Sequence, residues 1–274
     1  MNARRMWTVA RHDLRQLRQS PDFWAPMLIL AAMFFVVIPT FLLLAITSIG
    51  SVPTVQKVSA ALDLLPDKAQ SAVQGVSASD RTSYALAVYL FAPLAVIVPM
   101  TISTAVGANT LVGEREKGTG EFLAHSPASE REIYLGKLIA SLVPGYGTTL
   151  IGFGIYSLAV NLVVGPHVGG WFFPTAQWWV LMLWVLPPFL AITLSVVLRL
   201  SARVKSVAAA QQASGLVTLP LIVLSYAQAS GGLLGAGRSS GLLVGLVAWI
   251  VAAFGLVRGA RAVTRSRLLG VDAT

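Results

Sequence analysis

Charged side chains are scarce in this chain. Asp, Glu, Lys and Arg make up 11% of its 274 residues, whereas a soluble globular domain carries about 25%. So few charges do not cover a surface that faces water. Cysteine is absent as well, which excludes a disulfide scaffold and thiolate metal ligands. The three histidines, His12, His125 and His167, stand far apart, so none has a partner at the spacing of a metal site.

Signatures of catalysis are also missing. A nucleotide-binding loop needs Gly-x-x-x-x-Gly-Lys followed by Ser or Thr, but the single Gly-Lys pair, Gly136-Lys137, precedes Leu138. Residues 237–241 match the Gly-x-Ser-x-Gly pattern of serine hydrolases, yet the strand–turn–helix context that this pattern requires is missing. We therefore predict a chain that is not an enzyme, with no catalytic residue, no metal and no cofactor of its own.

Long apolar segments dominate what is present. About 20 apolar residues in a helix cross the ~30 Å of hydrocarbon in a bilayer. Six segments qualify, the last of them short and rich in glycine: roughly Phe23–Thr47, Tyr84–Thr110, Leu138–Val164, Trp178–Leu198, Ser206–Ala229 and Leu242–Val257. The sequence therefore predicts an all-α integral membrane protein with six transmembrane helices.

The positions of lysine and arginine predict the orientation. With the N-terminus inside, the cytoplasmic segments hold sixteen of these residues and the outer segments hold four, which is the asymmetry of the positive-inside rule. We expect a multi-pass protein of the cell membrane with both termini in the cytoplasm. The basic residues flank apolar spans, so lipid and not nucleic acid is the expected partner. Five aromatic residues at the outer ends of the third and fourth spans suggest an interfacial belt: Trp171, Phe172, Phe173, Trp178 and Trp179.

These predictions divide the chain into two parts. Residues 1–22 form an N-terminal interfacial helix and connector, and residues 23–274 form the six-helix transmembrane domain. Within the second part, 48–83 is an outer loop, 111–137 a cytoplasmic loop and 258–274 a cytoplasmic tail.

The segment before the first span is amphipathic. Its apolar residues fall within an arc of about 160° on a helical wheel, and four arginines lie on another side. Asp13 falls inside the apolar arc and interrupts it. We predict a helix in the inner membrane interface whose arginines reach anionic headgroups, with a solvated tail as the alternative. The residues expected at the interface are Arg4, Trp7, Arg11, Leu14, Arg15 and Arg18.

Ionisable residues are missing well inside the predicted spans. Ion-coupled carriers need such residues to bind or relay the coupling ion, so the chain lacks their machinery. The intramembrane polar groups are neutral, and Asn161, Tyr226 and Gln228 are candidates for a substrate pathway. Hydrogen bonds between helices are the alternative role for them.

One polar island interrupts the apolar sequence. Residues 113–137 hold five of the eleven acidic residues between the second and third spans. Gly118-Thr119-Gly120 is predicted to end a cytoplasmic extension of the second span, and Ser126-Pro127 to turn the chain. Ser129 and Glu132 have the spacing of a capping box that begins the next helix. We expect two short helices around a turn, which either dock on a partner or are simply solvated.

This island resembles the signature loop of the permease subunits of ABC transporters of the type-2 exporter class. In that family the pattern is roughly E-R-E-x-G-T-x-E-x-L, a proline turn and then E-I-x-x-G-K. The matching positions are Glu114, Arg115, Glu116, Gly118, Thr119, Glu121, Leu123, Pro127, Glu132, Ile133, Gly136 and Lys137. Gly120 departs from the pattern, which usually has an aliphatic residue or alanine there.

The resemblance implies a partner and a mechanism. Two permease chains, identical or different, would pair, and each would dock through this loop, as a coupling helix, onto one of two cytoplasmic ATPase subunits that bind ATP and Mg. The implied cargo is a hydrophobic or amphipathic substrate, such as a drug, a lipid or a lipid-linked molecule, exported from the cytoplasm or inner leaflet. The implied coupling residues are Glu114, Arg115, Glu116, Gly118, Thr119, Glu121, Phe122, Leu123, Pro127, Glu132 and Lys137.

Other classes stay open at this point. An ion-coupled secondary transporter would work without ATP, and an intramembrane enzyme would convert a lipid or peptide by itself. A non-transporting assembly or sensory subunit would share the loop and the ATPase and move no substrate.

Overall fold

The computed structural model describes residues 2–49, 70–116, 125–201, 209, 212 and 238–262, and within these ranges it contains helices and no strand. The α-helices are α1 (Ala3–Gln19), α2 (Pro21–Ala32), α3 (Ile38–Ile49), α6 (Ala78–Ala85), α7 (Leu94–Glu116), α9 (Glu130–Val163), α10 (Gly165–Val168), α11 (Ala176–Val180), α12 (Leu186–Ser201) and α14 (Arg238–Ala262). Three π-helical turns interrupt them: η1 (Met33–Val37), η2 (Leu86–Leu90) and η3 (Leu181–Val185). The all-α prediction is confirmed for this part of the chain.

Within the described residues, five helical segments are long and apolar enough to cross a membrane. They are Phe23–Ser48, Ala78–Thr110, Glu130–Val163, Ala176–Ser201 and Gly241–Ala260, and they contain or nearly coincide with the first four predicted spans and the sixth. The predicted fifth span, Ser206–Ala229, lies outside the described residues apart from Ala209 and Gln212. The count of six therefore stays a prediction.

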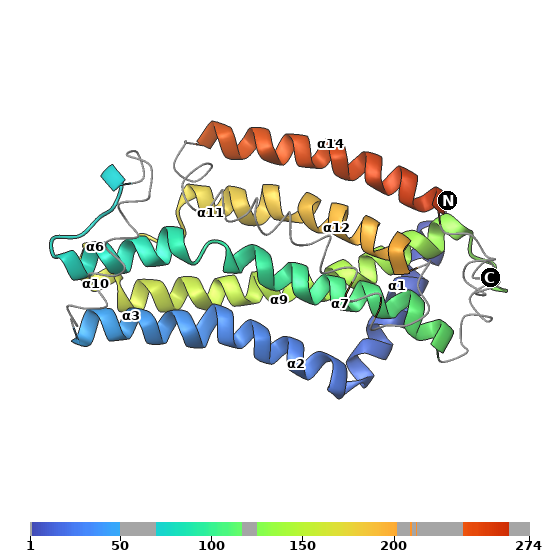
Figure 1. The fold of residues 1–274 in the computed structure, drawn as a ribbon, viewed down its shortest axis with the longest axis horizontal. Coiled ribbons are helices and arrows are strands. Elements are labelled where there is room, and N and C mark those ends of the chain that lie inside the picture. The colour runs from blue at the N-terminus through green and yellow to red at the C-terminus, as the bar shows by residue number, and fades with distance from the viewer. Residues whose placement is uncertain are drawn as a thin grey trace.

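The long helices lie side by side in an elongated bundle (Figure 1). α7 packs against both α9 and α12, and α14 packs against α12 at one edge. α2 and α3 pack against α9 on the opposite side. α1 leaves this arrangement, because it crosses the end of the bundle at a steep angle to α2.

Each π-helical turn precedes a proline. Pro39, Pro93 and Pro187 follow η1, η2 and η3 within three residues. Proline has no backbone N–H, so the carbonyl four residues earlier loses its usual partner, and a local π adjustment is one way in which a membrane-spanning helix satisfies the freed groups. At Pro93 the helix is interrupted altogether, and Figure 1 shows the irregular stretch between η2 and α7.

Aromatic side chains form the core at the predicted outer end. The Phe153 and Trp178 rings stack at 5.7 Å, and the Phe173 ring lies 5.0 Å from Trp178. The Trp178 indole N–H donates to the Val88 carbonyl at 2.8 Å, and the Tyr156 hydroxyl donates to the Ala87 carbonyl at 2.7 Å. Both carbonyls belong to η2, so the aromatic side chains complete the hydrogen bonding of this π-helical turn.

The aromatic belt prediction is wrong for two of its members. Phe173 and Trp178 are each 1% exposed and belong to this core. Trp171 and Trp179 keep exposed rings, at 69% and 48%, as residues at a lipid boundary do.

Candidate functional site

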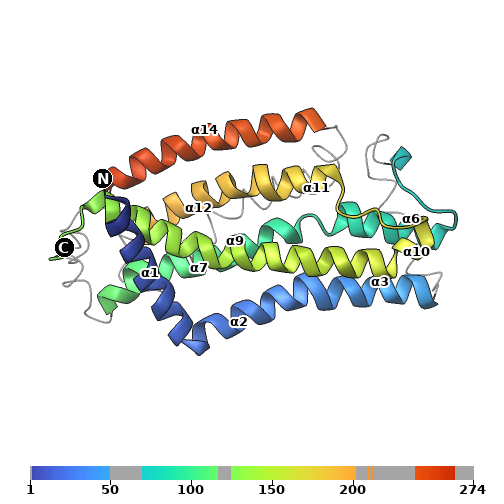
Figure 2. The ribbon, with the colours of Figure 1, turned by 180° about the vertical axis from the view of Figure 1, so that it is seen from behind.

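The polar island lies between the ends of two long helices. α7 stays helical to Glu116, and α9 begins at Glu130. The helix that contains the second span thus continues to Glu116, whereas the predicted break at 118–120 lies outside the described residues. α1 lies across α9 close to its start (Figure 2). Three elements from distant parts of the sequence therefore meet at the base of the loop.

The start of α9 is held by the predicted capping box. The Ser129 Oγ accepts from the Glu132 N–H at 3.4 Å, and the Glu132 Oε2 accepts from the Ser129 N–H at 2.9 Å. Together they satisfy two backbone donors that a helix start leaves free. The capping box is confirmed.

The same carboxylate also binds the N-terminal helix. The Asn2 N–H donates to the Glu132 Oε1, while the Asn2 side chain caps α1 by accepting from the Arg4 N–H at 3.0 Å. The Arg5 guanidinium donates to the Pro127 carbonyl at 2.9 Å. The start of α1 is therefore tied both to the turn before α9 and to the first turn of α9.

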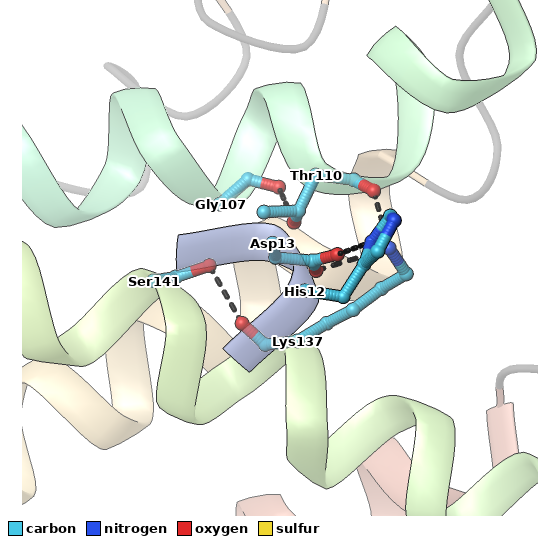
Figure 3. A network of polar contacts seen from close by, with 6 residues as sticks. All are labelled: His12, Asp13, Gly107, Thr110, Lys137 and Ser141. Atoms are coloured by element: carbon cyan, nitrogen blue, oxygen red, sulfur yellow. Dashed lines mark hydrogen bonds and ion pairs between the residues drawn. The ribbon is translucent and has the colours of Figure 1, made fainter. Parts of the chain in front are cut away.

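A buried lysine lies two turns further along α9. Lys137 is fully buried, and its Nζ lies 2.6 Å from the Thr110 carbonyl oxygen of α7 and 3.3 Å from the Asp13 Oδ2 of α1. Figure 3 shows the ammonium between these two groups. Burying a charge is costly unless it is paired and hydrogen-bonded, and both conditions are met here.

The other Asp13 oxygen points toward the surface. The Oδ1 lies 3.5 Å from the Nδ1 of His12, whose side chain is largely exposed. Asp13 itself is buried. This ion pair explains why Asp13 lies in the apolar arc of α1. The apolar arc is the face that meets α9, and Asp13 lies there because it pairs with Lys137 of α9.

Glycine allows the close contact between the two helices. A Cβ added at Gly136 would lie 2.8 Å from the Cβ of Val9 and 2.9 Å from the backbone oxygen of Met6. Real side chains do not approach so closely, so any larger residue would push α1 away. Val9, which faces Gly136, and the next residue, Ala10, are both buried.

The opposite face of α1 is basic and open. Arg4, Arg11, Arg15 and Arg18 are exposed, as is Trp7, and Leu14 is half-buried. Six described residues line an open pocket of about 690 Å³ on this face: Thr8, Arg11, His12, Leu14, Arg15 and Arg18. The interfacial location of these residues stays a prediction.

The predicted coupling residues fall into three groups. The backbone of Glu114, Arg115 and Glu116 forms the last turn of α7. Pro127 lies exposed in the turn before α9, whereas Glu132 and Lys137 are buried under α1. The remaining five lie outside the described residues: Gly118, Thr119, Glu121, Phe122 and Leu123.

The predicted substrate-pathway residues are only partly described. The Asn161 amide donates to the carbonyls of Ser157 and Phe173, and its oxygen accepts from the N–H groups of Phe172 and Phe173, both at 3.0 Å. These hydrogen bonds hold the loop before α11 in place, so the observed contacts of Asn161 have a structural role. Tyr226 and Gln228 lie outside the described residues.

Sequence reasoning missed the roles of Asp13 and Gly136. The signal for Asp13 was its position, because a carboxylate in the apolar arc of an amphipathic helix needs a buried partner. Gly136 and Lys137 were treated as parts of one loop motif, yet in the structure both face α1. In the parts that the structure describes, no three His, Cys, Asp or Glu side chains gather as a metal site would require.

Comparison with known proteins adds one match. The model of a family described as ABC-2 family transporter protein matches residues 7–234. No curated protein matches the chain. The matched range includes α1 from Trp7 onward, the polar island and the first four candidate spans.

Proposed function

The chain belongs to the ABC-2 transporter family, and we propose that it is the membrane-spanning permease subunit of an ATP-driven exporter. The observation that carries this proposal is the family match, which extends over most of the chain and over all of the polar island. The apolar helices support it, since they supply a membrane domain for transport. The chain has no nucleotide-binding loop, so the energy must come from a separate ATPase subunit.

The loop is the proposed docking element for that subunit. Glu114, Glu116 and Glu121 make its polar contacts, and Phe122 and Leu123 fill an apolar groove. The helical end of α7 and the capped start of α9 support this role, because they fix both ends of the intervening residues 117–124. A docked segment fixed at its two ends passes a movement on to the helices that carry it.

The proposed assembly contains two permease chains and two ATPase subunits, which bind ATP and Mg. It lies in the cell membrane with both permease termini in the cytoplasm, and the basic face of α1 meets anionic headgroups. The substrate is hydrophobic or amphipathic and leaves the cytoplasm or the inner leaflet. The scarcity of charge inside the spans supports this class of substrate.

Charge reversal in the loop tests the docking. The double variant Glu116→Lys/Glu121→Lys is expected to lose copurification with the ATPase subunit, because two attractive contacts become repulsive. The matched control is Lys57→Glu/Lys68→Glu, two charge reversals in the predicted outer loop, which should copurify like the parent chain. Equal recovery of the ATPase with the parent and with the loop variant would contradict the proposal.

A further inference from the structure

Part of the signature motif contacts the N-terminal helix of the same chain. Glu132, Gly136 and Lys137 all belong to the E-I-x-x-G-K segment, and each contacts α1. Lys137 has no exposed surface from which to reach a separate protein. A role for these three residues must therefore act through α1 and not by direct contact with an ATPase.

We propose that α1, the inner end of α7 and the start of α9 form one rigid unit, in which Asp13, Gly136 and Lys137 are positioning residues for coupling. This inference rests on the proposed function, since it concerns how movement of the docked loop reaches the spans. The loop moves the unit as a whole, and α1 carries that movement into the first span.

Contacts along the length of α1 make the unit rigid. Asn2 and Arg5 bind the start of α9 and the turn before it. Val9 packs on Gly136 one to two turns later, and Asp13 meets Lys137 one turn further on. Because contacts are spread over about three turns, α1 cannot pivot about a single point.

Lys137 is the central element of the unit. Its ammonium joins the carbonyl of Thr110 in α7 to the carboxylate of Asp13 in α1, and its own backbone belongs to α9. Separation of α1 or α7 from α9 would take the Asp13 carboxylate or the Thr110 carbonyl away from the buried ammonium, which is unfavourable in a site closed to water. The three helices therefore move together or not at all.

The connection from α1 to the first span is also ordered. α1 ends at Gln19 and α2 begins at Pro21. The Trp24 indole N–H donates to the Arg18 carbonyl at 3.2 Å, and the Phe23 N–H donates to the Ser20 carbonyl at 3.0 Å. This corner transmits a displacement of α1 to α2, which itself packs against α9.

The first arm of the test requires no ATPase. The chain lacks cysteine, so Ala10→Cys places a single thiol at a fully buried position of α1, next to the Val9 that packs on Gly136 of α9. In membrane vesicles that expose the inner face, a water-soluble maleimide should label this thiol slowly. Adding Gly136→Ala should make labelling several-fold faster, because the new methyl group displaces α1.

The same helix provides a matched control. A Cβ added at Gly147 of α9 would meet nothing within 4 Å, so Gly147→Ala should leave the labelling of Ala10→Cys slow. Lys137→Met is a second variant that loosens α1 without adding volume at the contact, and it should accelerate labelling as well. Fast labelling in the parent background, or equal rates for Gly136→Ala and Gly147→Ala, would overturn the rigid unit.

The second arm separates this inference from the proposed function. Gly136→Ala should recover as much ATPase subunit as the parent chain, because the docking loop is intact, while ATP hydrolysis by the complex falls to the rate of the isolated ATPase. Gly147→Ala should keep the parent rate. If Gly136→Ala also keeps the parent rate, the positioning role is wrong and the proposed function stands. If the parent chain itself binds no ATPase, the proposed function fails, whereas the labelling arm still reports on α1.

Discussion

Lys137 and Asp13 are separated by 124 residues in the sequence. In the folded chain, each side chain offsets part of the free-energy cost of burying the charge of the other. Lys137 was predicted from the motif as a residue of the cytoplasmic loop that couples to an ATPase subunit. Local spacing contains no information about a partner at such a distance, so its burial was not predictable from the motif. The capping box of Ser129 and Glu132 was predictable, because it depends on four consecutive residues and on backbone geometry alone.

The charge pair yields a prediction for stability. Asp13→Leu alone removes the carboxylate that faces the buried Lys137 ammonium, and it is expected to cost about 3–5 kcal/mol. The double variant Asp13→Leu/Lys137→Met removes both charges and should be less destabilised than Asp13→Leu. Thermal unfolding of the purified chain in detergent measures both, and purely additive effects of the two substitutions would contradict the account.

Asn161 supports a second prediction at this scale. Its side chain satisfies the N–H groups of Phe172 and Phe173 and the carbonyl of Phe173. Asn161→Leu leaves these buried backbone groups without a partner, at about 1–3 kcal/mol each. We expect a marked drop in the unfolding midpoint in detergent. Gln177→Leu changes an amide on the neighbouring α11 and serves as the control. An unfolding midpoint equal to that of the parent would show that Asn161 is not a structural clamp.

At the scale of the helices, hydropathy predicted the spans well because lipid solubility is a property of composition over about 20 residues. The first four predicted spans and the sixth correspond to observed helical segments. The aromatic belt was less predictable, since Phe173 and Trp178 fold back into the core while Trp171 stays exposed. Pattern alone does not distinguish an interfacial ring from one that a loop carries inward.

Helix packing gives a prediction with a control on the same helix. A Cβ added at Gly152 of α9 would lie 2.8 Å from the Phe35 ring of η1, whereas one at Gly154 would meet nothing within 4 Å. Gly152→Ala should therefore destabilise the chain by about 1–3 kcal/mol through overpacking. Gly154→Ala should be neutral or stabilising by up to about 1 kcal/mol, because alanine is the better helix former. Thermal unfolding in detergent compares the two, and equal effects would contradict the packing of α9 on η1.

For the whole molecule, the described helices expose apolar side chains on several sides, as a membrane domain must. Ile29 and Phe41 on the first span and Ile250 and Phe254 on α14 are each more than half exposed. The charged groups that the structure buries lie instead at the end where α1 crosses the bundle. Apolar sides that face lipid and one polar end that faces water are the arrangement expected of a membrane domain to which a cytoplasmic ATPase subunit docks.

Membrane topology and docking are tested together by one cysteine in the loop. Phe122→Cys introduces a single thiol into a chain that has none. An impermeant maleimide should label this thiol from the cytoplasmic side only, and adding the ATPase subunit should slow the labelling. Labelling from the outer side, or a cytoplasmic labelling rate that the ATPase subunit leaves unchanged, would contradict the proposal that residues 117–124 dock onto the ATPase subunit.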